Sequence, residues 1–350
     1  MFKKFLLSKL PFPWLNLIRM VRGNVIKVFV IVVPSYLLNE KYVSIKIKYS
    51  GVDECNENYK DSPSNRWALA FHEYYEKKQI DKIIPLMWAD GPAPGNFGDW
   101  LSPYIFSKIS KYKIRHVADF DNPKFKHILG VGSIAIKANK YSSVFGSGIS
   151  STDDRICPQA KYYFVRGPYT AAAVKKVGGI VQGNVTGDLG FLISRVYPVV
   201  KKSKIIDSVL VRHITHKYLP VKLIPGMIEL DISVSGSDDI ELFLQKLNSA
   251  KIVVTSAMHC YIACISYGIP CVLINFKDDS KSVYGDGVKY LDAMEGIGLN
   301  GYKPHLVEND LSLLNFPEIV DNRIVESKIL DDLYGCFVES ISDYFNTHNN

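Results

Sequence analysis

The chain has 350 residues, of which 47% are hydrophobic, so it can bury one large core or two domains. Its formal net charge of +7 is concentrated in residues 1–50, which hold nine Lys and Arg against a single acidic residue, Glu40. The remaining residues are close to neutral, which argues against a nucleic-acid-binding protein, because such a domain usually carries a basic face.

The six cysteines form no C-x-x-C pair. Three of them, Cys260, Cys264 and Cys271, fall in segments that we expect to form the core. This usage favours reduced, buried thiols in a cytoplasmic protein over a disulfide framework or a zinc site. We therefore expect neither a bound metal nor a cofactor.

Residues 1–22 mix five basic residues with bulky apolar and aromatic side chains. Lys9 interrupts the apolar run and no small-residue cleavage site follows, so the segment is not typical of a signal peptide. The longest charge-free apolar run, Val28–Leu38, is too short to span a bilayer. Two interpretations stay open: the segment packs into the first domain, or it holds the protein peripherally on an anionic membrane surface, at the inner face of the cytoplasmic membrane.

Residues 51–66 are polar and turn-rich and are predicted to form a loop, and alternating strands and helices are predicted from there on. Thr186–Asp188 is expected to follow a further short strand. The strands predicted in this half are Ile83–Trp88, His127–Val131, Ser143–Phe145 and Tyr162–Val165, and the helices are Trp67–Lys78, Trp100–Ser110 and Tyr169–Val177.

The proline- and lysine-bearing stretch Tyr197–Lys204 is the predicted domain boundary. The strands predicted after it are Ile205–Arg212, Lys251–Thr255 and Cys271–Phe276, and the helices are Asp238–Ala250, Met258–Tyr267, Asp286–Glu295 and Asn322–Phe345. We expect an N-terminal segment over 1–50, a first α/β domain over 51–200, a second over 205–320, and a helix in 321–350 that crosses back to the first domain.

The strand–helix–strand unit around His259 is the centre of the second domain. Ser256 is a suitable N-cap for the helix that begins at Met258, and Gly268 ends that helix. His259 therefore lies in the first helical turn, at the carboxyl end of a parallel strand. Ligands of open α/β sheets bind at that edge, and a helix N-terminus attracts anions.

Short motifs rich in glycine and polar residues follow the predicted strands. They are Gly95–Asp99, Gly130–Ser133, Gly146–Gly148, Val165–Thr170, Gly187–Asp188, Val211–His213, Ser256–His259 and Gly268–Pro270. In their order and spacing they resemble the polysaccharide pyruvyl transferase family. The resemblance implies two Rossmann-like domains with parallel sheets, arranged as in GT-B glycosyltransferases, with the active site in the cleft between them.

The resemblance also implies transfer of a pyruvyl group from phosphoenolpyruvate to a sugar, usually as a cyclic ketal. The acceptor would be a bacterial surface polysaccharide, such as a capsule or an exopolysaccharide, or its lipid-linked precursor. His259 matches the general acid proposed for the family. Many members have an arginine that contacts phosphoenolpyruvate where this chain has Ala257.

The expected chemistry assigns roles to the polar residues of these motifs. Histidine suits protonation of the enol methylene carbon, because it titrates near neutral pH. Asp99 and Asp188 are candidates to orient the sugar or to accept its proton. Arg166 and Arg212 can each offer a bidentate fork to the phosphate or the carboxylate of the donor. The other predicted substrate-binding residues are His213, Asn96, Gly98, Ser133, Ser147, Ser256 and Met258.

Two other functions stay open. One is a GT-B glycosyltransferase that uses a nucleotide sugar, which would need a base pocket and a carboxylate that binds ribose; Lys277–Asp279 stands where a Glu would be typical. The other is a non-catalytic, membrane-associated subunit of a polysaccharide assembly complex. Convergence of Arg166, Arg212 and His259 on one cleft is the expectation that separates an enzyme from such a subunit.

Overall fold

The structure is a computed structural model, and it describes residues 83–89, 95–117, 123–199, 205–277 and 283–347. The predicted helix Trp67–Lys78 and both interpretations of residues 1–22 lie outside the described residues. In the part of the chain that is described, no helix is long and apolar enough to cross a membrane.

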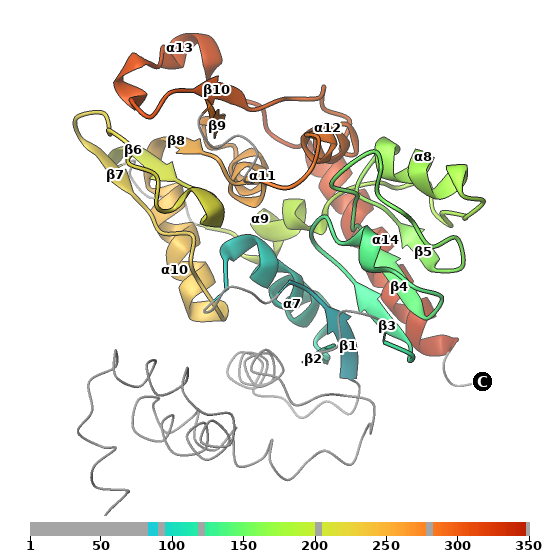
Figure 1. The fold of residues 1–350 in the computed structure, drawn as a ribbon. Helices are drawn as coiled ribbons and strands as arrows, with labels where there is room; N and C mark the ends of the chain where they lie inside the picture. The colour runs from blue at the N-terminus through green and yellow to red at the C-terminus, as the bar shows by residue number, and fades with distance from the viewer. Residues whose placement is uncertain (1–82, 90–94, 118–122, 200–204, 278–282, 348–350) are drawn as a thin grey trace, which may run out of the picture.

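The first half of the chain forms a parallel sheet in the order β2-β1-β3-β4-β5 (Figure 1). Its interior strands are almost wholly buried, as expected where helices cover both faces of a parallel sheet. The strands are β1 (Ile83–Met87), β2 (Lys113–His116), β3 (His127–Leu129), β4 (Ser142–Phe145) and β5 (Lys161–Phe164). The helical segments are α7 (Phe97–Ser110), η2 (Ala135–Lys137), α8 (Pro168–Lys176), η3 (Leu189–Leu192) and α9 (Ile193–Val196).

The second half forms another five-stranded parallel sheet in the order β10-β9-β8-β6-β7. The strands are β6 (Ile206–Val211), β7 (Met227–Glu229), β8 (Ala250–Thr255), β9 (Cys271–Phe276) and β10 (His305–Val307). The helical segments are η4 (Ile214–His216), α10 (Ser237–Asn248), α11 (Met258–Tyr267), α12 (Val288–Glu295), η6 (Leu311–Leu313) and α13 (Phe316–Ile319). Two parallel sheets with covering helices confirm the predicted α/β class.

The structure corrects the sequence-based assignment at the sheet edges. Strands β2, β7 and β10 were not predicted, because each has three or four residues that include polar ones and so lacks a clear apolar run. The short strand expected before Thr186 is wrong: the backbone there makes only an isolated bridge between Tyr162 and Val181, and η3 follows.

The last helix, α14 (Ser327–Asn346), packs against the first sheet, beside β4 and β5 in Figure 1. Phe337 is fully buried, with its ring centroid 4.9 Å from that of Phe106 and 6.3 Å from that of Phe145. The helix begins five residues later than predicted, because Asp321 instead exchanges two backbone hydrogen bonds with Cys271 of β9.

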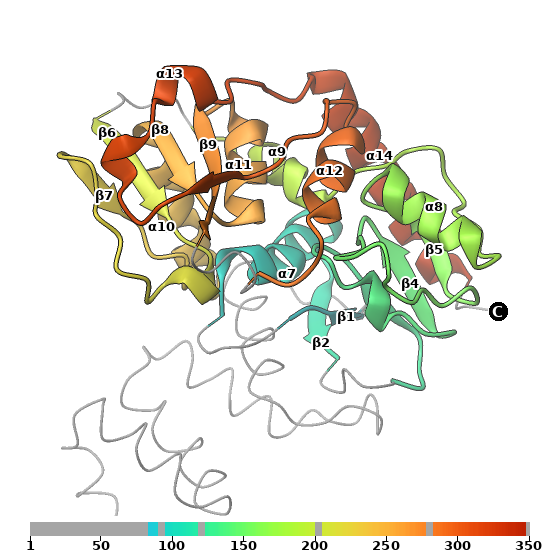
Figure 2. The ribbon, with the colours of Figure 1, turned by 45° about the horizontal axis from the view of Figure 1, so that its top comes forward.

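Helix α7 lies at the junction of the two halves in both ribbon views (Figure 1, Figure 2). Phe97 stacks on Phe243 of α10 with ring centroids 4.6 Å apart. The Tyr104 hydroxyl donates a hydrogen bond of 2.9 Å to Glu241 of the same helix. The two halves therefore share one hydrophobic core.

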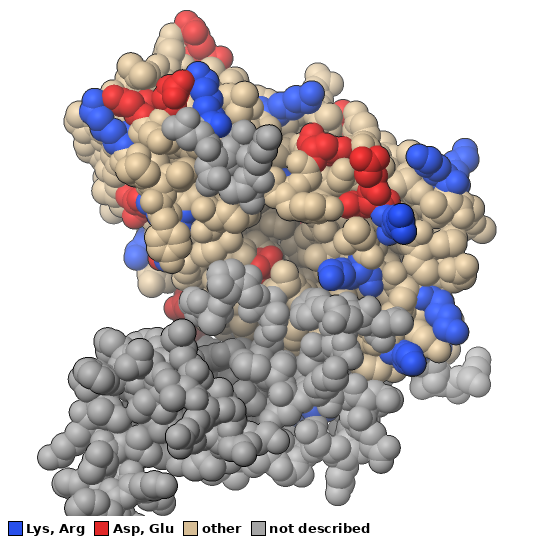
Figure 3. Space-filling view, viewed as in Figure 1, with Lys and Arg blue, Asp and Glu red and all other residues tan. Residues whose placement is uncertain are grey.

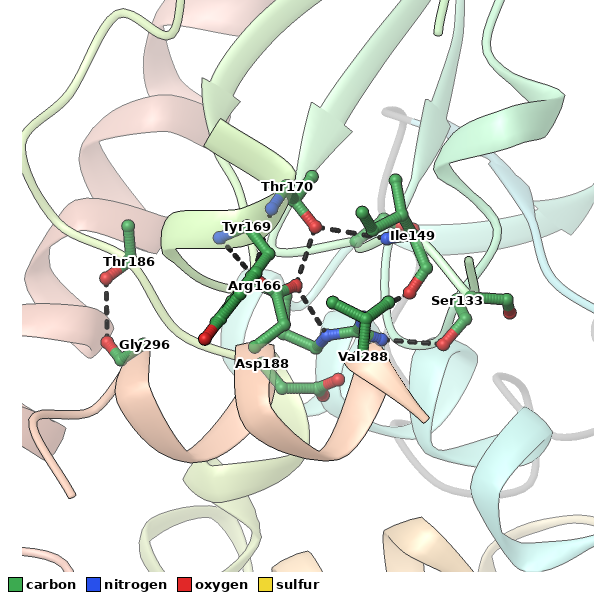
Figure 4. Close-up of polar contacts among 12 residues, drawn as sticks. Ser133, Ile149, Arg166, Tyr169, Thr170, Thr186, Asp188, Val288 and Gly296 are labelled. Carbon is green, nitrogen blue, oxygen red and sulfur yellow. Dashed lines mark hydrogen bonds and ion pairs between the residues drawn. The ribbon is translucent and has the colours of Figure 1, made fainter. Parts of the chain in front are cut away.

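A second connection between the halves joins Arg166, after β5, to Asp292 of α12; Arg166 and Asp292 are called the latch below. Both side chains are fully buried, and Arg166 Nε lies 3.0 Å from Asp292 Oδ2. The other guanidinium nitrogens donate to the Ser133 hydroxyl, at 2.6 Å, and to the Ile149 carbonyl (Figure 4). The guanidinium is thus bonded through all three of its nitrogens.

Asp292 also caps a helix of the other half. Its Oδ1 accepts hydrogen bonds from the backbone N–H groups of Tyr169 and Thr170 in the first turn of α8, at 2.9 and 3.0 Å, and the Thr170 hydroxyl donates to Oδ2 at 2.6 Å. A carboxylate at a helix N-terminus is stabilised by the helix dipole as well as by these bonds. Gly167 permits the close approach, since a Cβ there would overlap the Asp292 backbone.

Replacing Asp292 by Asn should destabilise the protein by about 3–5 kcal/mol, because removing one partner leaves a buried charge uncompensated. The free energy of unfolding from urea titration measures this. Asp207→Asn is the matched control: its ion pair with Lys251 is exposed, so its loss should cost less than about 1 kcal/mol. Equal unfolding free energies for the two variants would show that the latch stabilises the fold no more than an exposed ion pair does.

Candidate functional site

A pocket of about 130 Å³ lies where the two halves meet, at the carboxyl ends of strands from both sheets. The space-filling view shows a hollow in the middle of this face, with acidic and basic residues spread around it rather than gathered in one patch (Figure 3). The described residues that line it are Ala89, Asn96, Gly98, Asp99, Val131, Gly132, Ser133, Ile134, His213, Ile214, Ile232, Ala257, Met258, His259 and Lys289.

The pocket brings together seven of the residues predicted from the sequence. They are His259, Asp99, His213, Asn96, Gly98, Ser133 and Met258. They come from loops and helix starts after four different strands, which is the usual location of ligands in such sheets. An eighth, Asp188, lies directly behind His259.

His259 and Asp188 form a pair at the back of the pocket. Nε2 of His259 lies 3.7 Å from Oδ2 of Asp188, and both atoms are buried with no hydrogen-bond partner among the described residues. Asp188 Oδ1 accepts the backbone N–H of Gly190 at 2.8 Å, which fixes the carboxylate. The Asp188 carboxylate therefore faces the ring of His259 from the side away from the pocket lining.

The backbone of Gly98 packs closely against the His259 ring. A Cβ at Gly98 would overlap Nδ1 of His259, so the ring lies directly against the α7 backbone. Next to it, the Asn96 side chain accepts the Asp99 backbone N–H at 3.1 Å and also contacts the Asp99 carboxylate. Asn96 is therefore the N-cap of α7, and Asp99 lies in its first turn at the edge of the pocket.

Lys289, on α12, is a pocket cation that the sequence analysis missed. Burial, with the nearby Arg166 guanidinium, lowers its pKa to about 8. Its Nζ donates to the Tyr284 carbonyl at 3.3 Å. The residue lies in a helix remote in sequence from every glycine motif, so no local pattern marked it.

His213 lies after β6 and contributes its ring to the same pocket. Burial lowers its pKa to about 3, and the charge of Lys289 and the rings of His216 and His259 act in the same direction. The imidazole is therefore neutral across the physiological range.

Arg166 and Arg212 do not converge with His259, so the expectation that was to separate an enzyme from a non-catalytic subunit is not met. The Arg166 guanidinium is enclosed in the latch. Arg212 is paired with Glu229 of β7 through Nε and Nη2, at 2.7 and 2.9 Å, and its Nη1 donates to the carbonyls of His216 and Leu219. Neither side chain lines the pocket, because each is committed to joining segments of the fold.

Ser147 and Ser256 also serve the backbone and do not line the pocket. The Ser147 hydroxyl donates to the Gly132 carbonyl at 2.9 Å. The Ser256 hydroxyl accepts the His213 N–H at 2.8 Å and contacts Nδ1 of His216 at 2.9 Å. The prediction that Ser256 caps α11 is wrong, because Ala257 is the N-cap and its side chain makes no hydrogen bond. The N-terminal end of α11, which faces the pocket, therefore has no side chain of its N-cap residue accepting from its backbone N–H groups.

In the described ranges, no group of three or more His, Cys, Asp or Glu side chains is placed to hold a metal ion. The five cysteines that the structure describes are free thiols. What the pocket offers is an imidazole backed by a carboxylate, a neutral imidazole, an ammonium group and the first turn of α11. This arrangement can bind a small anion and deliver a proton to it.

Replacing Gly98 by Ala should lower turnover, because the new Cβ displaces the His259 ring, and this overpacking should also lower the unfolding free energy by about 1–3 kcal/mol. Gly335→Ala is the control: that glycine also lies within a helix, α14, but a Cβ there meets no atom within 4 Å. We expect both variants to fold, with a loss of turnover and of stability for Gly98→Ala alone. Full activity of that variant would contradict the close packing.

A sequence model of the family described as polysaccharide pyruvyl transferase matches residues 14–278. An uncharacterized protein of Acanthamoeba polyphaga mimivirus is 27% identical to this chain over 247 residues, which is 67% of this chain and 84% of the viral protein. No solved structure matches the chain. The family match contains every motif from which the resemblance was drawn and ends before Lys289 and Asp292. It confirms the resemblance, and the chain belongs to the polysaccharide pyruvyl transferase family.

Proposed function

We propose that this protein transfers a pyruvyl group from phosphoenolpyruvate to two hydroxyl groups of a sugar, forming a ketal. Family membership supports a transferase that acts on a saccharide. Since the two predicted arginines do not reach the pocket, the case for a transferase rests on this membership and on the other pocket residues. One observation supports phosphoenolpyruvate as the donor: His259, with Asp188 behind it, and Lys289 line the same small pocket. These groups supply a proton and a positive charge where a phosphate and a carboxylate would lie.

The donor binds with its anionic oxygens toward the Lys289 ammonium and the first turn of α11, whose N–H groups and dipole favour negative charge. His259 gives a proton to the methylene carbon, and the electrons of the C=C bond form the new C–H bond. The cation left at the adjacent carbon is stabilised by the oxygen that links this carbon to the phosphate.

A sugar hydroxyl then attacks that carbon, and its proton passes to Asp99, which lines the same pocket. A second hydroxyl of the same sugar then attacks this carbon as the phosphate leaves with the electrons of its C–O bond. The proton of that hydroxyl passes to the phosphate, and the proton held by Asp99 returns to His259. Asp188 lies behind His259 and orients it, so the two carboxylates predicted from the sequence have different roles.

The size of the pocket favours this donor over a nucleotide sugar. Its volume of about 130 Å³ is well below the several hundred Å³ of typical pockets for drug-sized ligands. A three-carbon acid with one phosphate fits such a space better than a nucleoside diphosphate with an attached sugar.

The two sheets and the helix that returns to the first of them support a GT-B-like arrangement as part of this proposal. We place the enzyme on the inner face of the cytoplasmic membrane, held by residues 1–22, with a lipid-linked saccharide as acceptor. The basic and apolar composition of that segment supports this location. Co-sedimentation with anionic vesicles, with and without those residues, tests it.

His259→Gln should keep the fold and lower turnover by about 10²–10⁴-fold, the usual contribution of general acid catalysis. The assay incubates the enzyme with phosphoenolpyruvate and an acceptor oligosaccharide and follows product mass and released phosphate. The product should gain the mass of pyruvic acid less water. Transfer from a nucleotide sugar instead, or near-wild-type turnover of a folded His259→Gln variant, would contradict the proposal.

The pKa of Lys289, about 8, predicts an alkaline limit to activity. Its ammonium is charged below that pH and neutral above it, so kcat/KM for phosphoenolpyruvate should fall as the pH rises through about 8, since this ratio reports ionisations of the free enzyme. Lys289→Arg should retain activity at higher pH because arginine stays charged, whereas Lys289→Met should be weak throughout. An unchanged alkaline limb in the Arg variant would exclude Lys289 as its cause.

A further inference from the structure

We propose that His213 is an uncharged hydrogen-bond donor to an anionic oxygen of the substrate, held by Thr215 in the tautomer that carries its proton on Nε2. The identity of that anion rests on the proposed function, whereas the tautomer does not. His213 thereby differs from His259, which lines the same pocket.

The tautomer follows from the contacts of the ring. Nδ1 of His213 accepts the backbone N–H of Thr215 at 3.3 Å and lies 2.8 Å from the Thr215 hydroxyl, so the ring caps η4. A backbone N–H can only donate, and a nitrogen that accepts from it carries no proton. In the neutral ring the proton must then be on Nε2.

The groups around His213 oppose a second proton. Lys289 of α12 brings a positive charge, the ring of His216 in η4 has its centroid 5.9 Å away, and His259 of α11 lies across the pocket. Asp99 of α7 is the carboxylate that lines the same pocket, and it contacts Asn96. Protonation would also break the Thr215 cap, because Nδ1 could no longer accept. Burial and this charge together keep His213 neutral.

The main chain of His213 is fixed as well, by the 2.8 Å hydrogen bond from its N–H to the buried hydroxyl of Ser256. The ring thus has a set position in the wall of the pocket, with Nδ1 occupied by Thr215. The Nε2–H group is the part of the ring that remains to meet a ligand. A neutral donor of this kind binds an oxyanion beside Lys289 at any pH at which the fold is intact.

The two imidazoles of one pocket therefore have separate tasks. His259 is backed by the Asp188 carboxylate, which suits a ring that gives a proton away. His213 is backed by a backbone N–H and faced by an ammonium group, which suits a donor that keeps its proton. When two titratable groups of one site have environments with opposite effects on protonation, the environments indicate which group acts as the acid. Here they assign that role to His259 and not to His213.

The tautomer can be measured without substrate, by NMR of the full-length protein labelled with ¹⁵N in its histidine rings. We expect the His213 resonances, assigned by loss of signal in His213→Gln, to show a protonated Nε2 and an unprotonated Nδ1, unchanged between about pH 5 and 9. Inorganic phosphate or phosphoenolpyruvate should shift the Nε2–H signal. Titration of His213 near neutral pH, a proton on Nδ1, or no response to either anion would overturn the proposal.

Two substitutions separate a neutral donor from an acid or base. His213→Gln keeps an N–H donor close to the position of Nε2 and cannot titrate, so kcat/KM for phosphoenolpyruvate should stay within a few-fold of wild type with the same pH profile. His213→Leu removes the donor and should lose roughly 10–100-fold, as expected for a hydrogen bond to a charged group. His305 lies in β10, outside the pocket, so His305→Leu is the control for a lost imidazole. This variant should change neither kcat/KM for phosphoenolpyruvate nor its pH profile.

A Gln variant as inactive as the Leu variant would make His213 an acid or base and refute the proposal. If phosphoenolpyruvate proves not to be the donor, no transfer will be seen with any variant, yet the tautomer and the shift caused by inorganic phosphate will still be measurable. Failure of the proposed function is thus distinguishable from failure of this inference.

Discussion

Burial of the Asp292 carboxylate between Arg166 and the N-terminus of α8 is the interaction on which the arrangement of the site depends. An isolated carboxylate inside a protein is costly, but here a guanidinium, two backbone N–H groups and a hydroxyl surround it. Asp292 lies one helical turn after Lys289 on α12. By tying that turn to the first half of the chain, the latch also holds the Lys289 ammonium over a pocket whose opposite wall comes from α7.

The pocket shows how packing and chemistry are combined. Gly98 lets α7 approach α11 so closely that the ring of His259 rests on the helix backbone, with Asp188 behind it. The same approach brings Asn96 and Asp99, at the start of α7, beside the first turn of α11. A small change in the spacing of these two helices would therefore move a proton donor, and the hydrophobic core that the helices share fixes that spacing.

The two arginines illustrate the limit of motif-based assignment. Arg166 and Arg212 each follow a parallel strand within a glycine- or histidine-bearing motif, as anion-binding residues often do. Their carboxylate partners, Asp292 and Glu229, are separated from them by 126 and 17 residues, and both pairs form only when distant segments pack. Lys289 presents the opposite case, since its helix has no motif and its proximity to His259 arises from the latch.

The sequence by itself determined the α/β class, the strand–helix–strand unit that presents His259, and the family, because apolar periodicity and glycine placement are local properties of the chain. Helix α11 and strand β9 have the predicted bounds, whereas the edge strands β2, β7 and β10 are too short and polar to show such a pattern. Only the tertiary structure decided which charged side chains reach the pocket. A buried charge must find a partner, and long-range packing assigned Arg166 and Arg212 to the fold and left Lys289, His213 and His259 to face a ligand.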